Sequence, residues 1–484
     1  MKKIILSGLA LLIAASAASC AENSESSADE NTAAIQTDAI TEAAAEPQTS
    51  LEMLGERDLG GMVYTVFDCN YLQDLYVNIP GEEQTGDIVN DILLERDALL
   101  EERYNCTIAY FQSDSMSHLS KMVAAGDNDW QMMIAEMVQL GTQATSGMLA
   151  NMCEVPYLEM NSAWWNPLLY ENMRLHDAMY FSSSAIAQSV YQTPTCLYLN
   201  LKLYDDYDFS EDIYQTVIDG KWTVDVLNQM TSGMNQDLNA DNKWSVYDDF
   251  FGLAVHPTVE PIHTMLISTG VSLSKINETG NRITADLTGD AHLIEVIEKL
   301  GDMFTTIKYN KINDFSTILF KEDRALFLMH KLESASMHLR DMESDYLILP
   351  CPKWDENQEQ YRTYMSQYGC CTIAVPLTAQ ENEDAGFMTE AMARSSYELV
   401  RPIAYDMVYK DKTSRDPRTV EVLDILLDSL YIDFTYLYDF GGITSNMQNP
   451  VFKGDPLVSM LEKRQSACND AVETFIEAWK PLED

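Results

Sequence analysis

The stretch Tyr191–Trp222, YQTPTCLYLNLKLYDDYDFSEDIYQTVIDGKW, decides how the rest of the chain is interpreted. Its first part, Thr195–Leu203, is apolar and β-prone except for one asparagine and one lysine, which predicts a short buried strand. An acidic, turn-rich segment follows. It leads into a predicted helix over 213–218 that ends at Gly220, where a residue without Cβ can take a left-handed conformation. Thr223 is then expected to cap a second helix.

The segment before this stretch alternates between strand-like and helix-like patterns. One helical candidate places Ile88, Ile92, Leu99 and Leu100 at spacings that bring apolar side chains to one face. Alternation of this kind predicts an α/β fold with a parallel, mostly buried sheet. The predicted strands are 61–67, 106–111 and 130–137, and the predicted helices are 88–103 and 118–125.

Polar residues follow the ends of these predicted strands. Asp68 and Asn70 come after the first strand, and Glu136 and Gln139 come after the third. In parallel sheets, ligands bind beyond the carboxyl ends of the strands. We therefore expect Asp68, Asn70 and Glu136 to contact a ligand.

The first twenty residues have the pattern of an export signal. Lys2 and Lys3 precede an apolar run, Ile4–Ala18, of about fifteen residues, which is short for a membrane span. The small residues directly before Cys20 resemble the bacterial lipobox, which implies lipidation of Cys20; a plain secretory cleavage site is the alternative. Residues 21–55 contain almost no large apolar side chains, which predicts a disordered acidic tether. We expect a protein anchored by lipid to the extracellular face of the cell membrane.

The net charge excludes one class of binding partner, and the cysteine spacing indicates the state of the thiols. Acidic residues number 76 against 31 basic ones, a formal net charge of −45, whereas nucleic-acid binding requires a basic surface. We therefore expect no nucleic-acid partner. The nine cysteines show no CxxC spacing, so we expect those other than Cys20 to be buried free thiols.

Several blocks of sequence occur in a characteristic order. LLEERYNCTIAYF (99–111), LSKMVAAGDNDWQMMIAE (119–136) and GMLANMCEVPYLEMNSAWWN (147–166) are followed by RALFLM (324–329) and ILPCPKW (348–354). In order and spacing these blocks resemble the extracellular solute-binding lipoproteins of ABC importers. The resemblance is to carbohydrate-type, maltodextrin-binding-protein-like members from Clostridia-like bacteria, and it covers the chain from Gly61 onward.

The resemblance implies a two-lobed periplasmic-binding-protein type II fold, in which two α/β lobes are joined by a multi-strand hinge. The chain of 484 residues also exceeds the size at which a single core keeps growing. Lobe 1 would comprise 61–198 and 332–373, and lobe 2 would comprise 199–331 and 374–484. The crossings would lie near 199–203, 329–333 and 372–377.

The tryptophan pair in the Trp164-Trp165-Asn166 motif, and aromatic and polar residues near these crossings, are further candidates for ligand contact. Sugars present C–H faces that stack on aromatic rings, and their hydroxyls bond carboxylates and amides. Core packing or a solvated loop is the alternative for each residue, and we expect one tryptophan of the Trp164–Trp165 pair to be buried. The candidates are Trp164, Trp165, Tyr191, His330, Glu333, Trp354 and Tyr368.

The segment 237–248 has the spacing of a calcium loop. Oxygen ligands recur at the positions that let several oxygens converge on one hard cation. Asn242 replaces the usual glycine, and an aspartate replaces the usual final glutamate. An acidic surface turn is the alternative, and a bound calcium would be structural. The ligands would be Asp237, Asn239, Asp241, the Lys243 carbonyl, Ser245 and Asp248.

The sequence contains no G-x-S-x-G elbow, P-loop or His-Glu-x-x-His motif, so we expect a binding protein without catalytic residues. The resemblance implies a monomer that needs no cofactor other than the calcium considered above. It would capture a carbohydrate, most simply an oligosaccharide, and deliver it to the transmembrane subunits of an ABC permease. The alternatives are a lipoprotein that binds peptides or another polar solute, a sensor subunit, and an exported glycan-degrading enzyme.

Overall fold

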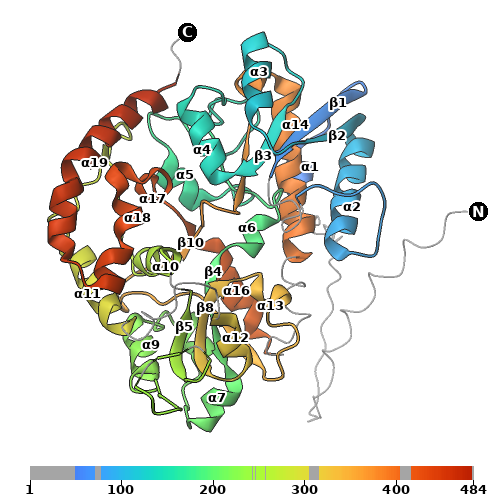
Figure 1. Cartoon of the computed structure of the whole chain (residues 1–484). Coiled ribbons are helices and arrows are strands. Elements are labelled where there is room, and N and C mark those ends of the chain that lie inside the picture. Colours follow the sequence, from blue (N-terminus) through green and yellow to red (C-terminus); the bar gives the residue numbers. More distant parts are fainter. Residues whose placement is uncertain are drawn as a thin grey trace, which may run out of the picture. The chain divides into compact units, whose positions relative to one another are not determined.

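The first sheet is built from the segment in which strands and helices alternate (Figure 1). Strand β1 (Met62–Cys69) runs parallel to β2 (Cys106–Gln112) and to β3 (Met132–Glu136), as the sequence predicts. Strand β11 (Cys371–Ala374) pairs antiparallel with β3 and completes the order β11-β3-β1-β2. This computed structural model describes residues 49–70, 78–242, 244–245, 247–256, 258–304, 316–403 and 416–481.

The second sheet is centred on the stretch that opens the sequence analysis. Strand β4 (Thr195–Asn200) is buried throughout and pairs antiparallel with β8 (Ala325–Lys331) on one side and β9 (Tyr346–Leu349) on the other. Strand β5 (Phe251–Val255) runs parallel to β8 at the edge. The order β5-β8-β4-β9 therefore mixes both strand directions.

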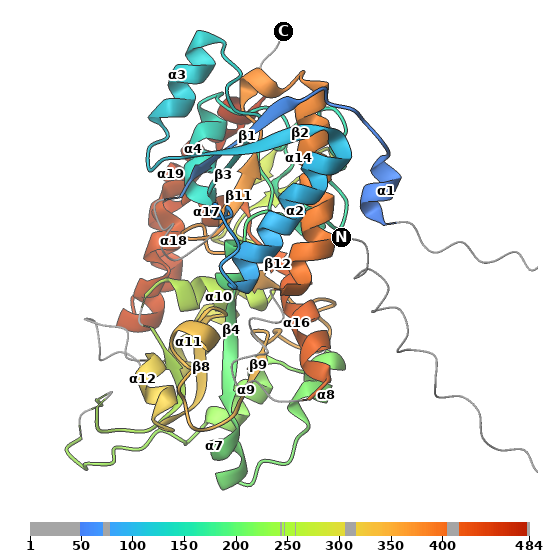
Figure 2. The same cartoon turned by 90° about the vertical axis from the view of Figure 1, so that its right-hand side faces the viewer.

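Helices cover both sheets (Figures 1 and 2). The longest, α19, contacts α4 beside the first sheet and α11 beside the second. The α-helices are α1 Ser50–Leu54, α2 Ile88–Tyr104, α3 Ser117–Ala125, α4 Met137–Thr145, α5 Pro167–Met173, α6 Ser189–Gln192, α7 Leu201–Asp206, α8 Ile213–Ile218, α9 Val224–Thr231, α10 Glu260–Ser268, α11 Ala291–Met303, α12 Ser316–Lys321, α13 Ser334–Met337, α14 Glu383–Ser395, α16 Arg418–Asp428, α17 Phe434–Tyr438, α18 Ile443–Asn446 and α19 Leu457–Trp479. The remaining elements are β6 Lys275–Ile276, β7 Ile283–Thr284, β10 Thr363–Tyr364, β12 Leu430–Tyr431, η2 Leu377–Ala379, η3 Ser396–Val400, η4 Phe440–Gly442 and η5 Asn449–Lys453.

The opening stretch folds largely as expected, with one correction. The predicted strand over 195–203 ends early, because the side chain of Asn200 accepts a hydrogen bond from Leu203 N at 2.9 Å and starts α7. Helix α8 has the predicted bounds, and Gly220 takes a left-handed φ of 70° after it. Thr223 caps α9 as predicted.

The strand pairing differs from the predicted lobe boundaries at two places. Residues 332–373 were expected in lobe 1, but β9 lies in the second sheet because it pairs with β4 from Leu197–Leu349 to Asn200–Tyr346. The chain therefore stays with the second sheet after β8 and reaches the first sheet only with β11. Residues 374–484 were expected in lobe 2, but α14 packs against α1 and α2 beside the first sheet (Figure 2).

The backbone of helix α1 is hydrogen-bonded to side chains of α14 and of η3, which follows α14 directly. Ser50 N donates to Glu398 Oε1 at 2.5 Å, and Ser50 O accepts from Arg394 Nη1 at 2.8 Å. Slightly further on, Arg57 Nη2 pairs with Asp384 Oδ1 at 2.6 Å. The first described residues are thus docked on a helix that lies more than three hundred positions later in the sequence.

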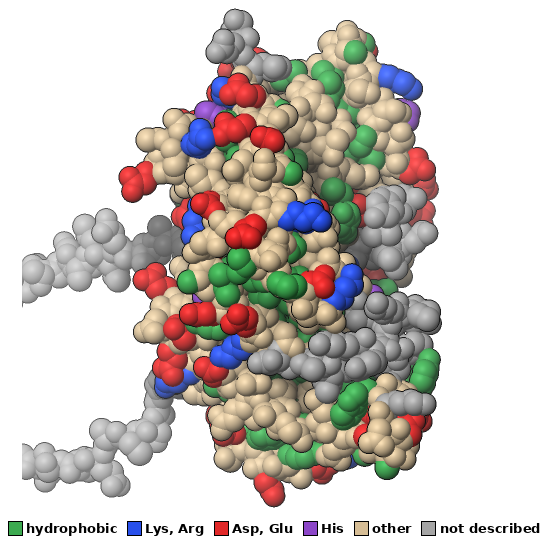
Figure 3. Space-filling view, turned by 60° about the vertical axis from the view of Figure 1, so that its left-hand side comes forward, with side chains coloured by type: hydrophobic (Ala, Val, Ile, Leu, Met, Phe, Trp, Pro, Cys, Tyr) green, Lys and Arg blue, Asp and Glu red, His purple; other side chains and the backbone are tan. Residues whose placement is uncertain are grey.

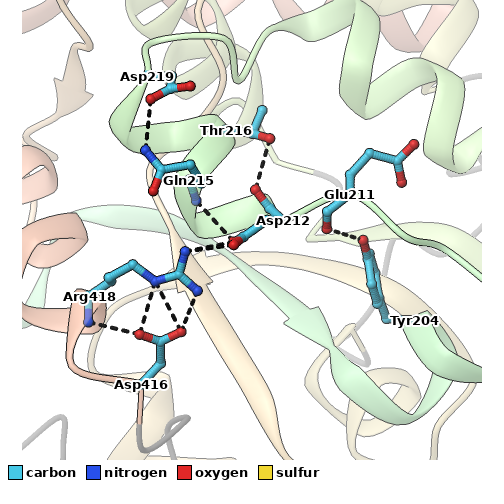
Figure 4. A network of polar contacts seen from close by, with 8 residues as sticks. All are labelled: Tyr204, Glu211, Asp212, Gln215, Thr216, Asp219, Asp416 and Arg418. Atoms are coloured by element: carbon cyan, nitrogen blue, oxygen red, sulfur yellow. Dashed lines mark hydrogen bonds and ion pairs between the residues drawn. The ribbon is translucent and has the colours of Figure 1, made fainter.

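Arg418 connects the start of α16 to the start of α8 (Figure 4). Its Nη1 lies 2.9 and 2.7 Å from the two carboxylate oxygens of Asp212, which also caps α8. Its Nη2 lies 2.6 Å from Asp416 Oδ2. The hydrogen bonds that Arg418 donates to both aspartates raise its pKa and hold its guanidinium between two elements that are distant in sequence.

Replacing Arg418 by glutamine is expected to lower the free energy of unfolding by about 1 kcal/mol, because a multidentate but partly exposed pair contributes at the upper end of the surface range. Lys202→Gln is the matched control, since Lys202 pairs with Asp206 one turn away on α7 and is half exposed. We expect a clearly smaller effect for this exposed pair. Urea denaturation of both variants measures the difference, and equal losses would show that the Arg418 network adds nothing.

Acidic side chains are spread over the face of the protein shown in Figure 3, with basic side chains between them.

The eight described cysteines are all free, and seven of them are buried, which confirms the prediction of buried thiols. Among the described residues, no helix combines the length and apolar character needed to cross a membrane. Cys20 and residues 21–48 of the predicted tether lie outside the described residues. The prediction of a disordered tether is wrong for its last part, because Ser50–Leu54 forms α1, which Thr49 caps and which buries Ser50 and Leu51.

Candidate ligand-binding site

The carboxyl ends of the first sheet's parallel strands carry buried polar side chains. Asp68 and Asn70 at the end of β1 are each 1% exposed, and Glu136 ends β3 without any exposure. Asp68 Oδ2 accepts from Gln112 Nε2 at 3.1 Å, whereas Oδ1 has no hydrogen bond of normal geometry among the described residues. Burial raises the pKa of Asp68 to about 6, and hydrogen bonds from Gln112 and Asn78 oppose that rise.

Other buried polar atoms, each in a segment next to the strand ends of one sheet or the other, also lack a partner among the described residues. They are Asn78 Oδ1, Gln139 Oε1 on α4, Gln192 Oε1 at the end of α6 and Thr258 Oγ1 after β5. Most buried polar groups in folded proteins are hydrogen-bonded, so such a group of exceptions indicates water or a ligand. A ligand that fits here must itself supply several hydrogen-bond donors and acceptors.

The second sheet contributes a hollow of about 180 Å³ at the ends of its parallel strands β5 and β8. His330 at the end of β8 is hydrogen-bonded through Nδ1 to Ser334 Oγ, which fixes its ring. Glu333 N donates to Gln192 O at 2.9 Å and so ties this edge to α6. The hollow is lined by Thr195, His256, Thr258, Glu260, Pro261, Met329, His330, Lys331 and Glu333.

The loop 365–370 joins the two sets of strand ends. Ser366 Oγ donates to Glu260 Oε1 at 2.8 Å, and Gly369 N donates to Glu136 Oε1 at 3.0 Å. Between these two anchors, Tyr368 is 56% exposed. Burial raises the pKa of the Cys370 thiol to about 12. The charge of Lys331 lowers this pKa and the charge of Glu136 raises it, so Cys370 lies close to residues of both sets of strand ends.

We call this group the strand-end site: Asp68, Asn70, Glu136, Glu260, His330, Glu333 and Tyr368. It brings together six of the ten predicted contact residues and adds Glu260. Glu260 could have been found from its position in the sequence. It is the first residue of the helix that follows β5, in the same way that Met137 is the first residue of the helix that follows β3. Asn78, Gln192 and Thr258 carry no comparable signal, because a single amide or hydroxyl in a loop is common.

Trp164, Trp165 and Tyr191 lie elsewhere. Both tryptophans donate their ring N–H to the buried Glu390 on α14, at 2.6 Å from Trp164 and 2.9 Å from Trp165. Trp165 is 1% exposed, as expected for one member of the pair. The three residues line a second hollow of about 240 Å³, which shares no lining residue with the hollow at β5 and β8. We call it the tryptophan hollow.

Trp354 lies against α11. Its ring meets His292 edge-on at 5.2 Å between centroids, and Lys299 Nζ lies 4.7 Å from the ring centre. No contact among the described residues joins Trp354 to the strand-end site.

The predicted calcium loop forms a turn that is held by its own aspartates. Asp237 Oδ2 accepts from Asn242 N at 2.7 Å, and Asn239 Oδ1 accepts from Asp241 N at 3.0 Å. Asp248 is exposed, whereas its neighbour Asp249 is buried and accepts from Leu238 N and Ser245 N. Lys243 lies outside the described residues, and the described ranges contain no group of three or more His, Cys, Asp or Glu side chains arranged for a metal ion.

Comparisons with known proteins agree with this architecture. No protein-family model and no curated protein sequence matches the chain. Among solved structures, it is similar to a cyclo/maltodextrin-binding protein complexed with maltotetraose, at 13% identity and a TM-score of 0.53 over 87% of this chain and 98% of that one. It is also similar to an extracellular solute-binding protein from Staphylococcus aureus in complex with maltose, at 10% identity and a TM-score of 0.56 over 85% and 98%.

A third similar structure is an ABC substrate-binding protein from Listeria monocytogenes in complex with cycloalternan, at 14% identity and a TM-score of 0.50 over 86% and 99% of the two chains. Nearly the whole of each of these proteins is matched. The chain therefore has the mixed α/β, two-lobed type II fold of solute-binding proteins.

Proposed function

We propose that this chain captures a carbohydrate at the strand-end site and delivers it to an ABC permease from the outer face of the cell membrane. The observation that carries the proposal is the set of buried polar atoms at the strand ends of the two sheets that have no partner among the described residues. The loop that bears the exposed Tyr368 joins these two sets of strand ends. A sugar hydroxyl both donates and accepts hydrogen bonds, so it can satisfy carboxylate and amide oxygens at the same time. The apolar face of the same sugar ring can stack on tyrosine.

The fold supports capture by closure of two lobes. In such proteins, ligand binding favours the closed arrangement by bending at the connecting segments. Here the loop 365–370 contacts both Glu136 beside the first sheet and Glu260 beside the second, so a ligand on Tyr368 would be reached from both sides. The ligands in the similar structures are all carbohydrates, which supports an oligosaccharide as the ligand of this chain.

Lipidation of Cys20 would keep the protein close to its permease, because tethering raises the effective concentration of the two partners. The acidic residues 21–48 would then connect the lipid to α1. No covalent chemistry is required of the protein.

Tyr368→Ala is expected to weaken sugar binding by about fivefold, because stacking on an aromatic ring contributes about 1 kcal/mol beyond the buried area. A thermal-shift screen against mono- and oligosaccharides, amino acids and short peptides first identifies the ligand, since a ligand that binds only the native state raises the melting temperature. Calorimetry then compares wild type with Tyr368→Ala. Tyr247→Ala is the control, because Tyr247 is similarly exposed and belongs to the loop that follows Asp237.

Three outcomes would count against parts of the proposal. A shift with peptides and with no sugar would exclude a carbohydrate ligand. Recovery of shortened sugar would indicate an enzyme. Equal affinities of wild type and Tyr368→Ala would place the sugar elsewhere on the protein.

A further inference from the structure

The tryptophan hollow has walls from both sheets. Trp164, Ser183 and Tyr397 belong to elements around the first sheet, because Ser182 bridges to Ile373 of β11 and η3 packs on α2 and α14. Asp428 belongs to α16, which packs on β9 and α8 beside the second sheet. Tyr191 lies on α6, directly before β4. A molecule in this hollow would therefore touch both halves of the protein.

Its aromatic rings are held in place before any ligand arrives. The ring N–H of Trp164 donates to Glu390 Oε1 at 2.6 Å, and the Arg394 guanidinium lies 4.2 Å from the centre of the same ring. Arg401 lies 4.9 Å from the centre of the Tyr397 ring. Because these contacts fix the ring planes, stacking a ligand on them would cost little side-chain entropy.

Polar groups stand beside these rings. Ser183 is 3% exposed, and its hydroxyl makes no hydrogen bond to any described residue. Arg401 Nη2 and Asp428 Oδ1 form an ion pair at 2.7 Å across the hollow's lining, and Asp424 lies 3.4 Å from the same guanidinium. The hollow thus offers a hydroxyl, a carboxylate and a guanidinium next to aromatic faces.

We propose that the tryptophan hollow is a second binding site, which takes a single pyranose-sized polyhydroxy ring. Its volume of about 240 Å³ is below the ~300–1,000 Å³ of pockets for drug-sized ligands and suits a single ring. The C–H face of the ring would stack on Trp164, and its hydroxyls would bond Ser183 and the Arg401–Asp428 pair. The inference does not depend on what occupies the strand-end site.

Occupation of this hollow would also affect the strand-end site. Its walls come from elements on both sheets, so any lobe movement that changes the strand-end site changes this hollow as well. If each ligand favours the same arrangement, each strengthens the binding of the other by the same factor, because linkage is reciprocal.

The test uses methyl α-D-glucopyranoside as the probe, with the full-length protein in three forms. Ala163→Trp places an indole at the exposed rim of the hollow, Ser183→Val removes the Ser183 hydroxyl, and Tyr368→Ala alters only the strand-end site. Calorimetry is expected to show probe binding in wild type and in Tyr368→Ala, binding at least fivefold weaker in Ser183→Val, and no binding at this site in Ala163→Trp. Melting temperatures of all variants check that they fold.

Probe binding that is unchanged in both Ala163→Trp and Ser183→Val would overturn the proposal, and so would loss of all probe binding in Tyr368→Ala. The same set separates this inference from the proposed function. If the strand-end site binds no sugar, the probe still binds Tyr368→Ala and is still lost in Ala163→Trp.

Discussion

Glu390→Ala is expected to lower the free energy of unfolding by about 4 kcal/mol, the usual scale for breaking a buried ion pair on one side. Glu390 has no exposed surface and accepts from Trp164 Nε1, Trp165 Nε1 and Arg394 Nε. Without Glu390, the buried Arg394 would keep an ion pair with the half-exposed Glu159. The two indole N–H groups would lose their acceptor. Each unsatisfied buried donor adds a penalty of about 1–3 kcal/mol, partly relieved by local rearrangement.

Chemical denaturation measures this loss, and Glu383→Ala on the same helix is the matched control. Glu383 is largely exposed and meets Arg57 at 3.3 Å, so we expect its replacement to cost less than about 0.5 kcal/mol. A loss of under 1 kcal/mol for Glu390→Ala would mean that the cluster is solvated and that the tryptophans are held by packing alone. Such a result would also remove the preorganisation that the tryptophan hollow requires.

Asp68→Asn is expected to stabilise the protein above pH 7 and to weaken ligand binding. The ordinary pKa of aspartate is 3.8, and burial raises that of Asp68 to about 6. Because the folded state binds this proton more tightly than the unfolded state, the contribution of Asp68 to stability is full below pH 4 and is lost as the pH rises through 6. A difference of about two pKa units corresponds to about 3 kcal/mol at pH 8. The asparagine variant has no carboxyl at this position, so its free energy of unfolding lacks this pH-dependent contribution.

Urea denaturation of both proteins at several pH values between 4 and 8 tests the sign. The stability of wild type minus that of Asp68→Asn should fall with rising pH, mostly between pH 4 and 6. Asp58→Asn is the control with the opposite sign, because hydrogen bonds from Asn105 and Gly60 lower the pKa of the exposed Asp58. A pH-independent difference for Asp68 would show that its carboxylate is well solvated.

The same variant removes an anionic acceptor from the strand-end site. Hydrogen bonds to charged groups contribute about 1.5–3 kcal/mol, so the dissociation constant of the identified sugar should rise about 10- to 100-fold. A stabilised variant with weaker binding would show that Asp68 is retained for ligand recognition at the expense of stability. Unchanged affinity would remove Asp68 from the site.

Local patterns in the sequence predicted local structure well. The bounds of α8, the left-handed Gly220 and the Thr223 cap each depend on a few neighbouring residues, and all three are confirmed. Asp68 and Glu136 were placed at strand ends because strand polarity alone puts them there. Asn200 shows the limit of this reasoning, since its amide can continue a strand or cap a helix and only the fold decides which.

Contacts between residues far apart in the chain could not be predicted from the sequence. Nothing near Trp164 in the sequence identifies Glu390, which lies more than two hundred positions later, as the acceptor of its ring N–H. The assignment of β9 to the first lobe failed for the same reason, because its pairing with β4 joins residues about 150 positions apart. Trp354 near a predicted crossing likewise gave no sign that α11 would cover it.

The docking of α1 on α14 has a mechanical consequence. Any tension on the chain before Thr49 is borne first by the two Ser50 backbone hydrogen bonds to Glu398 and Arg394, and next by the Arg57–Asp384 pair. These contacts lie between the point of pulling and β1. They should therefore break under force before any force reaches the strands of the first sheet. In a single-molecule stretching experiment, α1 should detach as a separate low-force step, and the site-bearing strands should stay folded until higher force.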